Sequence, residues 1–207
     1  SCNFKINKAL ALELNKIFLE VVIANGFETD ALKILKKKKN IRIIDASEFM
    51  MKDLIRFDSV NESILTQSED LKVFEPKDFK IVSKQKPNKY QLKNLIFAFN
   101  VCRYVKSNAI VLASQEATVG IGSGQPSRLD SCQIAIDKMN KFQNLKEDVV
   151  AASDAFFPFI DGIEKLVQSG VSAVIQPSGS IRDKEIIKFA NQTGTILVFS
   201  RTRHFRH

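Results

Sequence analysis

The sequence predicts a layered α/β protein, and three observations support this prediction. Short apolar runs alternate with segments of helical periodicity along most of the 207 residues, which is typical of helices packed against a largely parallel sheet. The hydrophobic content of 44% is enough for a substantial core. No apolar run approaches the roughly 20 residues that a membrane span needs, so we expect no membrane partner.

The first part of the chain is predicted to form two strands and two helices. The β-branched run in IFLEVVIA is typical of a buried strand, and a second strand follows the next helical segment. Two strands joined through a helix usually pair in parallel. The predicted elements are a helix over residues 5–16, a strand over 17–24, a helix over 28–39 and a strand over 41–45.

Residues 46–78 are more polar and less regular than the rest. One short strand is predicted at residues 63–67, and the remainder is interpreted as connection. Pro76 and Pro87 interrupt the region, so a domain boundary is predicted near Asp78. We therefore expect one unit over residues 1–78, which is the tail of a larger unit, and a complete second unit over residues 79–207.

The second unit shows the clearest alternation. Glycines at positions 170 and 194 mark the ends of two of its helices. The predicted strands are residues 79–83, 109–113, 117–121, 149–154, 171–176 and 195–200, and the predicted helices are residues 88–105, 128–142, 161–169 and 182–192.

Charge and composition exclude some functions. The net charge of +8 favours acidic partners, but the densest basic run, Lys36 to Lys39, lies at the end of a predicted helix, where cations complement the helix dipole. No aromatic side chains interleave a basic stripe, so we expect no nucleic-acid partner. Three scattered cysteines and two late histidines offer no metal-ligand spacing. Unpaired thiols fit a reducing compartment, and we expect a cytoplasmic location.

The segment SNAIVLASQEATVGIGSGQPSRLDS carries the first candidate site. Its second strand runs into Gly120, Gly122 and Gly124, directly before a predicted helix, where exposed backbone N–H groups suit an anionic or polar ligand. Arg128 offers a planar fork at this position. We expect its replacement by alanine to weaken ligand binding and to spare thermal stability. The alternative is that the glycines only permit a tight turn.

Three later strands also end in unusual turns, and ligands of open parallel sheets bind outside the carboxyl ends of strands. The turns are SDAFFPFID, PSGS and RTRHFRH, so four segments are predicted to converge. Three Phe around one Pro cannot all point inward, and at least one is expected to offer a flat face. The alternatives are a buried Phe cluster, a simple helix cap at PSGS and a frayed chain end.

Several known motifs are absent from the sequence. There is no G-x-x-x-x-G-K-[ST] loop, and the glycine spacing is not G-x-G-x-x-G, so the common nucleotide fingerprints fail. The zinc-deaminase signature and a serine-hydrolase nucleophile elbow are also missing.

Together, VGIGSGQPSRLDS, SDAFFPFIDGI, IQPSGSIRD and the terminal RHFRH resemble the C-terminal part of AICAR formyltransferase, the transformylase half of the bifunctional AICAR transformylase/IMP cyclohydrolase family. The upstream IFLEVVIANGFETDALKILKKKKNIRII is similar to that family as well. The resemblance implies a cytidine-deaminase-like layered sheet, duplicated within the transformylase half and lacking the deaminase zinc. It also implies a homodimer with active sites at the subunit interface.

The resemblance implies transfer of a formyl group from 10-formyltetrahydrofolate, as co-substrate, to the 5-amino group of AICAR, with no metal. Residues matching the family's AICAR contacts are Asn108, Arg128, Phe156, Arg203 and His207. Residues matching the folate side are Pro158, Phe159, Asp161 and Ser180.

One departure qualifies the resemblance. The family's catalytic Lys-His pair lies upstream in a K-H-x-x-P-x-G motif, and this chain contains no Lys-His dipeptide. We therefore expect a piece of the transformylase that binds substrates, carries no catalytic residue and is inactive alone. Two alternatives stay open, a stand-alone non-catalytic nucleotide- or phosphate-binding module and a nucleic-acid-binding domain driven by charge.

Overall fold

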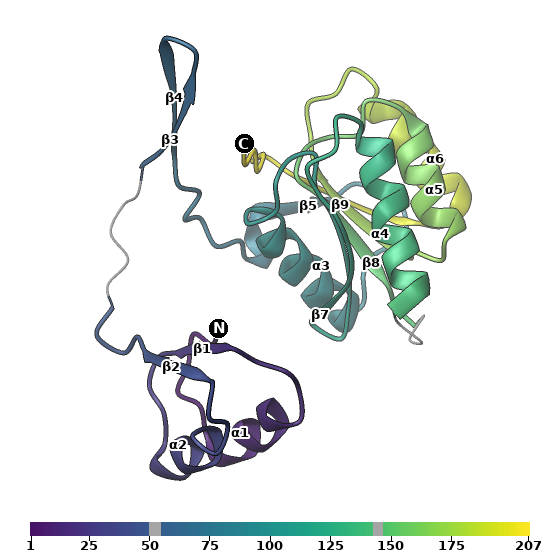
Figure 1. Ribbon diagram of the computed structural model, residues 1–207. Helices are drawn as coiled ribbons and strands as arrows, with labels where there is room; N and C mark the ends of the chain where they lie inside the picture. The colour runs from purple at the N-terminus through teal and green to yellow at the C-terminus, as the bar shows by residue number, and fades with distance from the viewer. Residues whose placement is uncertain (50–54, 143–146) are drawn as a thin grey trace. The chain divides into compact units, whose positions relative to one another are not determined.

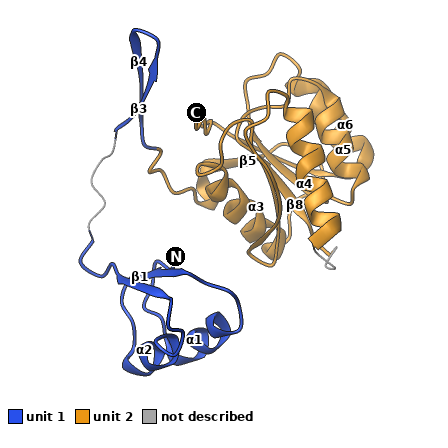
Figure 2. Ribbon diagram, viewed as in Figure 1, with its two compact units in different colours: residues 1–69 blue, residues 70–207 orange. Residues whose placement is uncertain are grey.

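A computed structural model describes residues 1–49, 55–142 and 147–207 of the chain (Figure 1). Contacts divide the chain into two compact units, residues 1–69 (unit 1) and residues 70–207 (unit 2), as Figure 2 shows. The division falls after Glu69, whereas the sequence predicts it near Asp78. Within the described residues, no helix is both long enough and apolar enough to cross a membrane.

Unit 1 contains a small layer of two helices on a parallel strand pair. The N-cap side chain of Asn7 accepts a hydrogen bond from the Leu10 backbone, which fixes the start of the first helix. Ile6, Ala11, Val22 and Leu35 are among the buried core residues. The parallel pairing predicted from sequence is confirmed. The elements are α1 (Lys8–Asn15), β1 (Val21–Ala24), α2 (Thr29–Leu35) and β2 (Arg42–Asp45).

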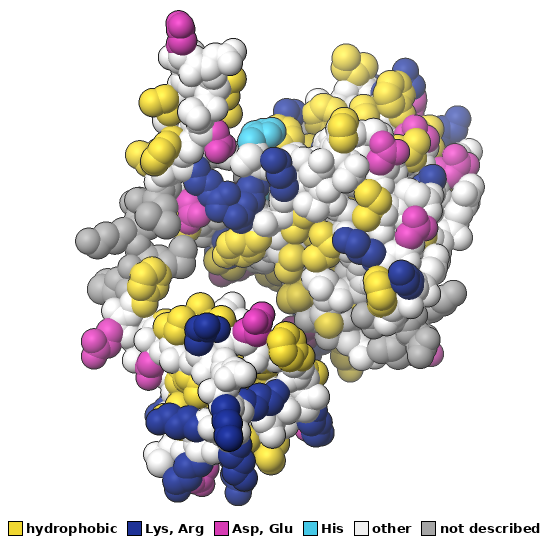
Figure 3. Space-filling model, viewed as in Figure 1, with side chains coloured by type: hydrophobic (Ala, Val, Ile, Leu, Met, Phe, Trp, Pro, Cys, Tyr) yellow, Lys and Arg dark blue, Asp and Glu magenta, His cyan; other side chains and the backbone are white. Residues whose placement is uncertain are grey.

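The first predicted strand is too long, because only the last four of its residues pair. The lysine run begins at the C-cap of α2, and Lys36, Lys37 and Lys39 are exposed. Dark-blue side chains gather over this unit in Figure 3. The basic run is therefore a solvated helix end in the structure.

Residues 46–78 contain the strand predicted over residues 63–67, and part of the predicted connection before it is a second strand, which corrects the sequence-based interpretation. A β-hairpin forms from β3 (Ile55–Val60) and β4 (Ser63–Ser68), with its turn at Asn61 in the left-handed region. Its apolar side chains face solvent, Phe57 at 73% and Ile64 at 69% exposure. Figure 3 shows yellow side chains on the surface of this hairpin. The strand β3 was missed from sequence, although Ile55 to Asp58 alternate apolar and polar side chains as a strand does. Residues 50–54 of the predicted connection lie outside the described residues.

Unit 2 is built on a six-stranded sheet with the strand order β5-β10-β9-β8-β6-β7. The sheet is mixed, which corrects the prediction of a largely parallel one: only β8–β9 and β9–β10 pair in parallel, and both sheet edges are antiparallel. The strands are β5 (Phe79–Ile81), β6 (Ile110–Ser114), β7 (Ala117–Gly122), β8 (Val150–Ser153), β9 (Ala173–Pro177) and β10 (Ile196–Ser200).

Helices cover both faces of this sheet. One face packs on α3 around Leu95 and Phe99, and the other packs on three helices around Met139, Leu166 and Ile186. Side chains of alternate strand residues enter the two cores, as the two-residue period of a strand requires. The helices are α3 (Lys89–Cys102), α4 (Arg128–Phe142), α5 (Ile160–Gln168) and α6 (Asp183–Thr193), with a short 3₁₀ helix, η1, at Pro76–Asp78.

The segment between Asp70 and η1 belongs to unit 2 because it packs against α3. The backbone N–H of Phe74 donates to Asn100 Oδ1 at 2.9 Å, and the Phe74 ring meets the Phe99 ring edge-on at 4.9 Å. Only 2% of Phe74 is exposed. The burial of Phe74 in unit 2 explains why the boundary between the two units falls before Pro76 and Pro87.

The glycines of β7 serve helix packing more than turn formation. A Cβ on Gly120 would lie 2.1 Å from the carbonyl oxygen of Ala135, and one on Gly122 would lie 1.9 Å from that of Ser131. Strand β7 therefore lies against the α4 backbone at a distance that only glycine permits. Of the three glycines singled out from sequence, Gly124 alone has a positive φ, of 68°.

Candidate functional site

The loops that carry the predicted site lie at one end of the strands of the unit 2 sheet. The strand registers place Asn108 before β6 beside the ends of β7 and β8, because Ile110 pairs with both Gly122 and Ser153. The loops after β9 and β10 leave the sheet at the same end, since those strands run parallel to β8. The sheet topology therefore brings these loops together.

A cavity of about 500 Å³ opens among these loops. Segments near Asn108, before α4, before α5 and at the chain end contribute to it. Its lining includes Asn108, Pro126, Ser127, Arg128, Phe156, Pro158, Phe159, Asp161, Arg203 and Phe205.

Seven of the nine predicted site residues line this one cavity, whereas Ser180 and His207 do not. The Ser180 hydroxyl accepts a hydrogen bond from the Arg182 backbone at 3.1 Å, so it shapes the turn before α6. The His207 ring lies 5.8 Å from the Phe205 ring, and Phe205 is itself a lining residue. Three of the four segments expected to converge therefore form the cavity, and the PSGS turn stands beside it.

Arg128 is anchored by the protein, which changes its expected role. Its guanidinium forms an ion pair with Asp154, donates to Ser153 Oγ at 2.9 Å and donates to Asn108 Oδ1 at 2.7 Å. The Arg128 side chain is 9% exposed and that of Asp154 is fully buried. Three of the five guanidinium N–H donors are thus used inside the protein, and two remain for a ligand.

Asn108 is also held from several sides. Its amide nitrogen donates to the carbonyl oxygens of Gln125 at 2.9 Å and Pro126 at 3.1 Å, while its amide oxygen accepts from Arg128. The backbone carbonyl of Asn108 accepts from Ser131 Oγ at 2.8 Å. The Asn108 side chain therefore holds the turn at Gln125 and Pro126 against the start of α4. One lone pair of its amide oxygen stays free for a ligand.

The three phenylalanines after β8 divide between core and cavity, as expected from sequence. Phe157 is 1% exposed in the core, whereas Phe156 is half-buried and Phe159 is 52% exposed. The Phe157 ring fills the space where a Cβ on Gly162 would lie, at 2.7 Å, so α5 begins close against it. Phe156 and Phe159 thus present flat faces at the cavity.

Phe156 and Phe159 are each paired with an arginine. The Arg203 guanidinium lies 4.8 Å from the centre of the Phe156 ring, and the Arg182 guanidinium lies 4.8 Å from that of Phe159. Such stacking holds a guanidinium in place while its N–H donors stay available. Arg182 was missed by sequence analysis, although it stands within the quoted IQPSGSIRD segment.

Asp70 and the buried His204 form a hydrogen-bonded pair that sequence analysis also missed. The His204 Nδ1 bonds to the Asp70 carboxylate, and its ring lies 4.9 Å from Phe74 and 4.4 Å from Phe99. The His204 backbone N–H donates to the Asp154 carbonyl oxygen at 2.9 Å. This link holds the chain end beside the cavity, so Arg203 and Phe205 are ordered by their buried neighbour.

Stability of the fold is expected to fall on mild acidification because of His204. Burial lowers the pKa of His204 below 6.5, an effect that Arg103 reinforces and that the carboxylates of Asp70 and Asp154 oppose. Between the lowered pKa and 6.5 the unfolded chain therefore binds more protons, and the free energy of unfolding drops by up to about 1.4 kcal/mol per pH unit. Urea unfolding between pH 7.5 and 5 measures this slope.

The slope is expected to shrink in His204→Gln and to persist in His207→Gln, whose side chain is exposed. Equal slopes in the wild type and His204→Gln would contradict the assignment.

The described residues offer no metal cluster and no reactive thiol at the cavity. No three His, Cys, Asp or Glu side chains gather in a metal-binding arrangement within the described ranges. Burial raises the pKa of Cys132 to about 12 and raises that of Cys102. Both thiols therefore stay protonated near neutral pH and pack as small apolar groups.

The fold and the cavity together define an α/β domain that presents guanidinium groups and flat aromatic faces at one end of its strands. This combination suits a planar, polar or anionic small molecule rather than a macromolecule.

Comparison with known proteins identifies the family. Residues 1–138 match the family model described as "AICARFT/IMPCHase bienzyme", and the chain belongs to this family. It is 44% identical over 207 residues to the bifunctional purine biosynthesis protein PurH of Lactobacillus acidophilus and 43% identical over 208 residues to that of Ligilactobacillus salivarius. It is 43% identical over 204 residues to PurH of Leptospira biflexa.

These alignments cover nearly the whole chain but only part of each relative. They include 99%, 99% and 98% of the chain, respectively, and 40% of each relative. The chain thus spans about two fifths of the length of the curated relatives that it matches.

Proposed function

We propose that the protein containing this chain transfers a formyl group from 10-formyltetrahydrofolate to the 5-amino group of AICAR, giving FAICAR in purine biosynthesis. The supporting observation is that seven of the nine residues matching the family's substrate contacts line one cavity of unit 2. Family membership gives the reaction class.

Within the proposal, the cavity binds AICAR from two sides. Arg203, stacked on Phe156, is the guanidinium with the most free donors and would bind an anionic or carboxamide oxygen of AICAR. Arg128 and Asn108 hold each other and offer their remaining donors and acceptor to the same ligand. His207, whose ring lies beside that of Phe205, is proposed to contact the same ligand from the end of the chain.

The folate side is proposed to lie along Pro158 and Phe159. The exposed Phe159 ring suits a flat pteridine, and Arg182 fixes that ring from the other face. Asp161, in the first turn of α5, lines the same part of the cavity. Ser180 would contribute by shaping the adjoining turn.

The chemistry requires the AICAR amine to attack the formyl carbon. A new C–N bond forms, the bond from the formyl carbon to the folate nitrogen breaks, and the amine proton passes to that nitrogen. Alignment of the two substrates supplies much of the rate, and donors must stabilise the developing oxyanion. The described cavity positions substrates, while the proton-transferring Lys-His pair is proposed to lie upstream of this chain.

Other parts of the proposal follow from the family resemblance. The fold of unit 2 is proposed to be cytidine-deaminase-like, with unit 1 as the C-terminal portion of a preceding similar subdomain. The whole protein is proposed to act in the cytoplasm as a homodimer with active sites at its interface. The exposed apolar side chains of the β3–β4 hairpin are consistent with a surface that another part of the assembly covers.

A direct assay tests the proposed function. The whole protein should form FAICAR from AICAR and 10-formyltetrahydrofolate, and Arg203→Gln should lower kcat/KM by about tenfold or more because a charge-assisted hydrogen bond is lost. Lys188→Gln, an exposed lysine of α6, is the matched control and should leave kcat/KM unchanged. Absence of product with the whole protein would refute the proposal.

The chain by itself is expected to show negligible formyl transfer. The reason is that it lacks the Lys-His pair and supplies only part of the substrate contacts. The measurement compares product formation by residues 1–207 with that of the same chain joined to its upstream segment. Comparable turnover by both would show instead that the catalytic groups lie within this chain.

A further inference from the structure

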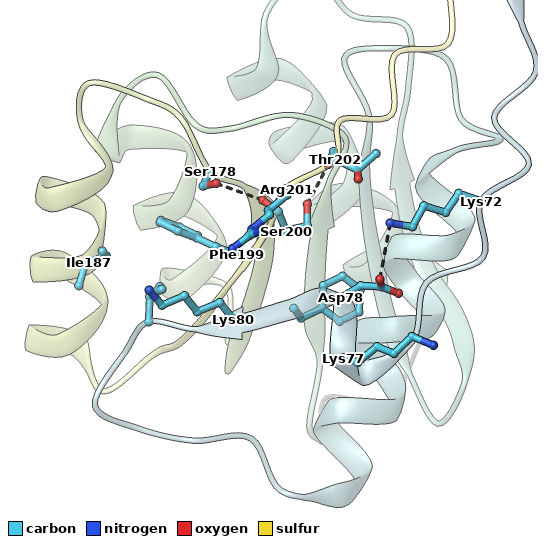
Figure 4. Close-up of a pocket in the computed structure, with 12 residues that line it drawn as sticks. Lys72, Lys77, Asp78, Lys80, Ser178, Ile187, Phe199, Ser200, Arg201 and Thr202 are labelled. Atoms are coloured by element: carbon cyan, nitrogen blue, oxygen red, sulfur yellow. Dashed lines mark hydrogen bonds and ion pairs between the residues drawn. The ribbon is translucent and has the colours of Figure 1, made fainter.

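A second cavity, of about 620 Å³, lies between the edge strand β5, the end of β10 and helix α6 (Figure 4). It shares no lining residue with the cavity described above. The Ser178 backbone N–H donates to the Ser200 carbonyl oxygen at 2.9 Å, and these two residues line the second cavity where the chain turns away from the sheet. The two cavities are therefore separate sites in one unit.

The pairing of β5 with β10 sets the side chains of the second cavity. Lys80 lies directly opposite Phe199 in this antiparallel pair, so their side chains share one face of the sheet. Val82 continues that face along the chain, and Ile187 approaches from α6. Val82, Ile187 and Phe199 thus give the cavity an apolar floor, with Lys80 at its edge.

Positive charge at this cavity exceeds what the protein neutralises. Lys72 pairs with Asp78 at 3.5 Å, and Lys77 pairs with Glu75 at 2.7 Å. By contrast, the side chains of Lys80 and Arg201 form no hydrogen bond or ion pair with any residue in the described ranges. Both line the cavity, and Figure 4 shows Arg201 beside Phe199 and Lys80 below it, apart from the Lys72–Asp78 pair. Two positive charges are therefore left for a ligand.

Two uncompensated cations match a dianion. A phosphate monoester carries a charge of about −1.5 to −2 at pH 7, and it accepts the paired N–H donors of an arginine together with a lysine ammonium. The apolar floor suits an organic group attached to the phosphate rather than a bare inorganic ion. The Thr202 hydroxyl, which also lines the cavity, supplies a neutral hydrogen-bonding group.

The geometry points to a second ligand site for the phosphate monoester of a small organic molecule, with the phosphate between Lys80 and Arg201 and the organic group on Phe199. This site is independent of the formyl-transfer cavity, and its occupancy does not depend on the proposed reaction.

Saturation-transfer NMR with phenyl phosphate tests the site on the whole protein at low salt. Phenyl phosphate is expected to bind, and the Lys80→Glu/Arg201→Glu variant should weaken binding by at least about tenfold, since two charge-assisted contacts are replaced by repulsion. Lys188→Glu reverses a charge on α6 outside the cavity and should bind as the wild type does. Arg203→Gln should also retain binding, which separates this site from the first cavity.

Two further ligands distinguish the chemistry. Inorganic phosphate should bind more weakly than phenyl phosphate because it cannot use the apolar floor, and benzylsuccinate tests a dicarboxylate of similar shape. Three results would each overturn the inference. They are binding of phenyl phosphate that does not saturate, equal affinity of the Lys80→Glu/Arg201→Glu and Lys188→Glu variants for phenyl phosphate, and a higher affinity for benzylsuccinate than for phenyl phosphate. Thermal unfolding checks each variant, and Lys80→Gln and Arg201→Gln replace the double variant if it does not fold.

Discussion

Replacing Gly122 by alanine is expected to destabilise unit 2 by about 3 kcal/mol, the upper part of the range for overpacking. The added Cβ would lie 1.9 Å from the carbonyl oxygen of Ser131 and 2.6 Å from its carbonyl carbon. Both obstructing atoms belong to the α4 backbone, so no side-chain rotation relieves the contact. Strand β7 and helix α4 would have to separate. This would also displace the turn between them, whose Pro126 and Ser127 line the cavity.

Urea unfolding monitored by circular dichroism measures this effect. Gly194→Ala is the matched control, because Gly194 has a φ of 70° but no atom within 4 Å of its added Cβ. Its substitution costs only the strain of a left-handed residue, about 1–2 kcal/mol. If the two variants unfold at the same urea concentration, the close approach of β7 to α4 is not what requires glycine at position 122.

Replacing Arg128 by alanine is expected to cost about 3–5 kcal/mol of stability as well as ligand binding. The carboxylate of Asp154 is fully buried, and its ion pair with Arg128 offsets the cost of that burial. Without the guanidinium, Asp154 keeps a hydrogen bond from the Ser107 hydroxyl but loses its charge partner. This expectation reverses the one drawn from sequence alone, in which the Arg128 side chain was free to bind a ligand and dispensable for stability.

A double-mutant cycle separates the two effects. Adding Asp154→Asn to Arg128→Ala removes the buried charge, and we expect it to recover part of the lost stability without restoring formyl transfer. Thermal unfolding and the formyl-transfer assay, applied to the same variants, give both readouts. Unchanged unfolding temperature in Arg128→Ala would show that the buried pair contributes no stability.

The elements of unit 2 could be predicted because its inner strands are short apolar runs and its helices have apolar residues at helical spacing. Helix α4 begins and ends where the sequence predicts, and β6 and β7 are adjacent as expected. Strand direction could not be predicted in the same way. The antiparallel edge strands β5 and β7 follow from which strands lie side by side, a long-range property that a local period does not contain.

The candidate site was predicted in outline because strand ends converge at one end of the sheet. The buried partners Ser153 and Asp154 of Arg128 could not be inferred from spacing, since they lie on a different strand. The two cationic side chains of the second cavity could not be inferred from sequence spacing either. Lys80 and Arg201 lie far apart in the sequence and meet only because β5 pairs with β10.

The bond between Asp70 and His204 has a topological consequence. Asp70 is the first residue of unit 2, and His204 follows its last strand, β10, so the bond joins the segment that enters the unit to the segment that leaves its sheet. A domain closed in this manner can be inserted into a longer chain without a spacer, and its ends can be joined and reopened elsewhere. The exposed turn between β6 and β7, at Gln115 and Glu116, is a natural point for new termini in a circular permutant.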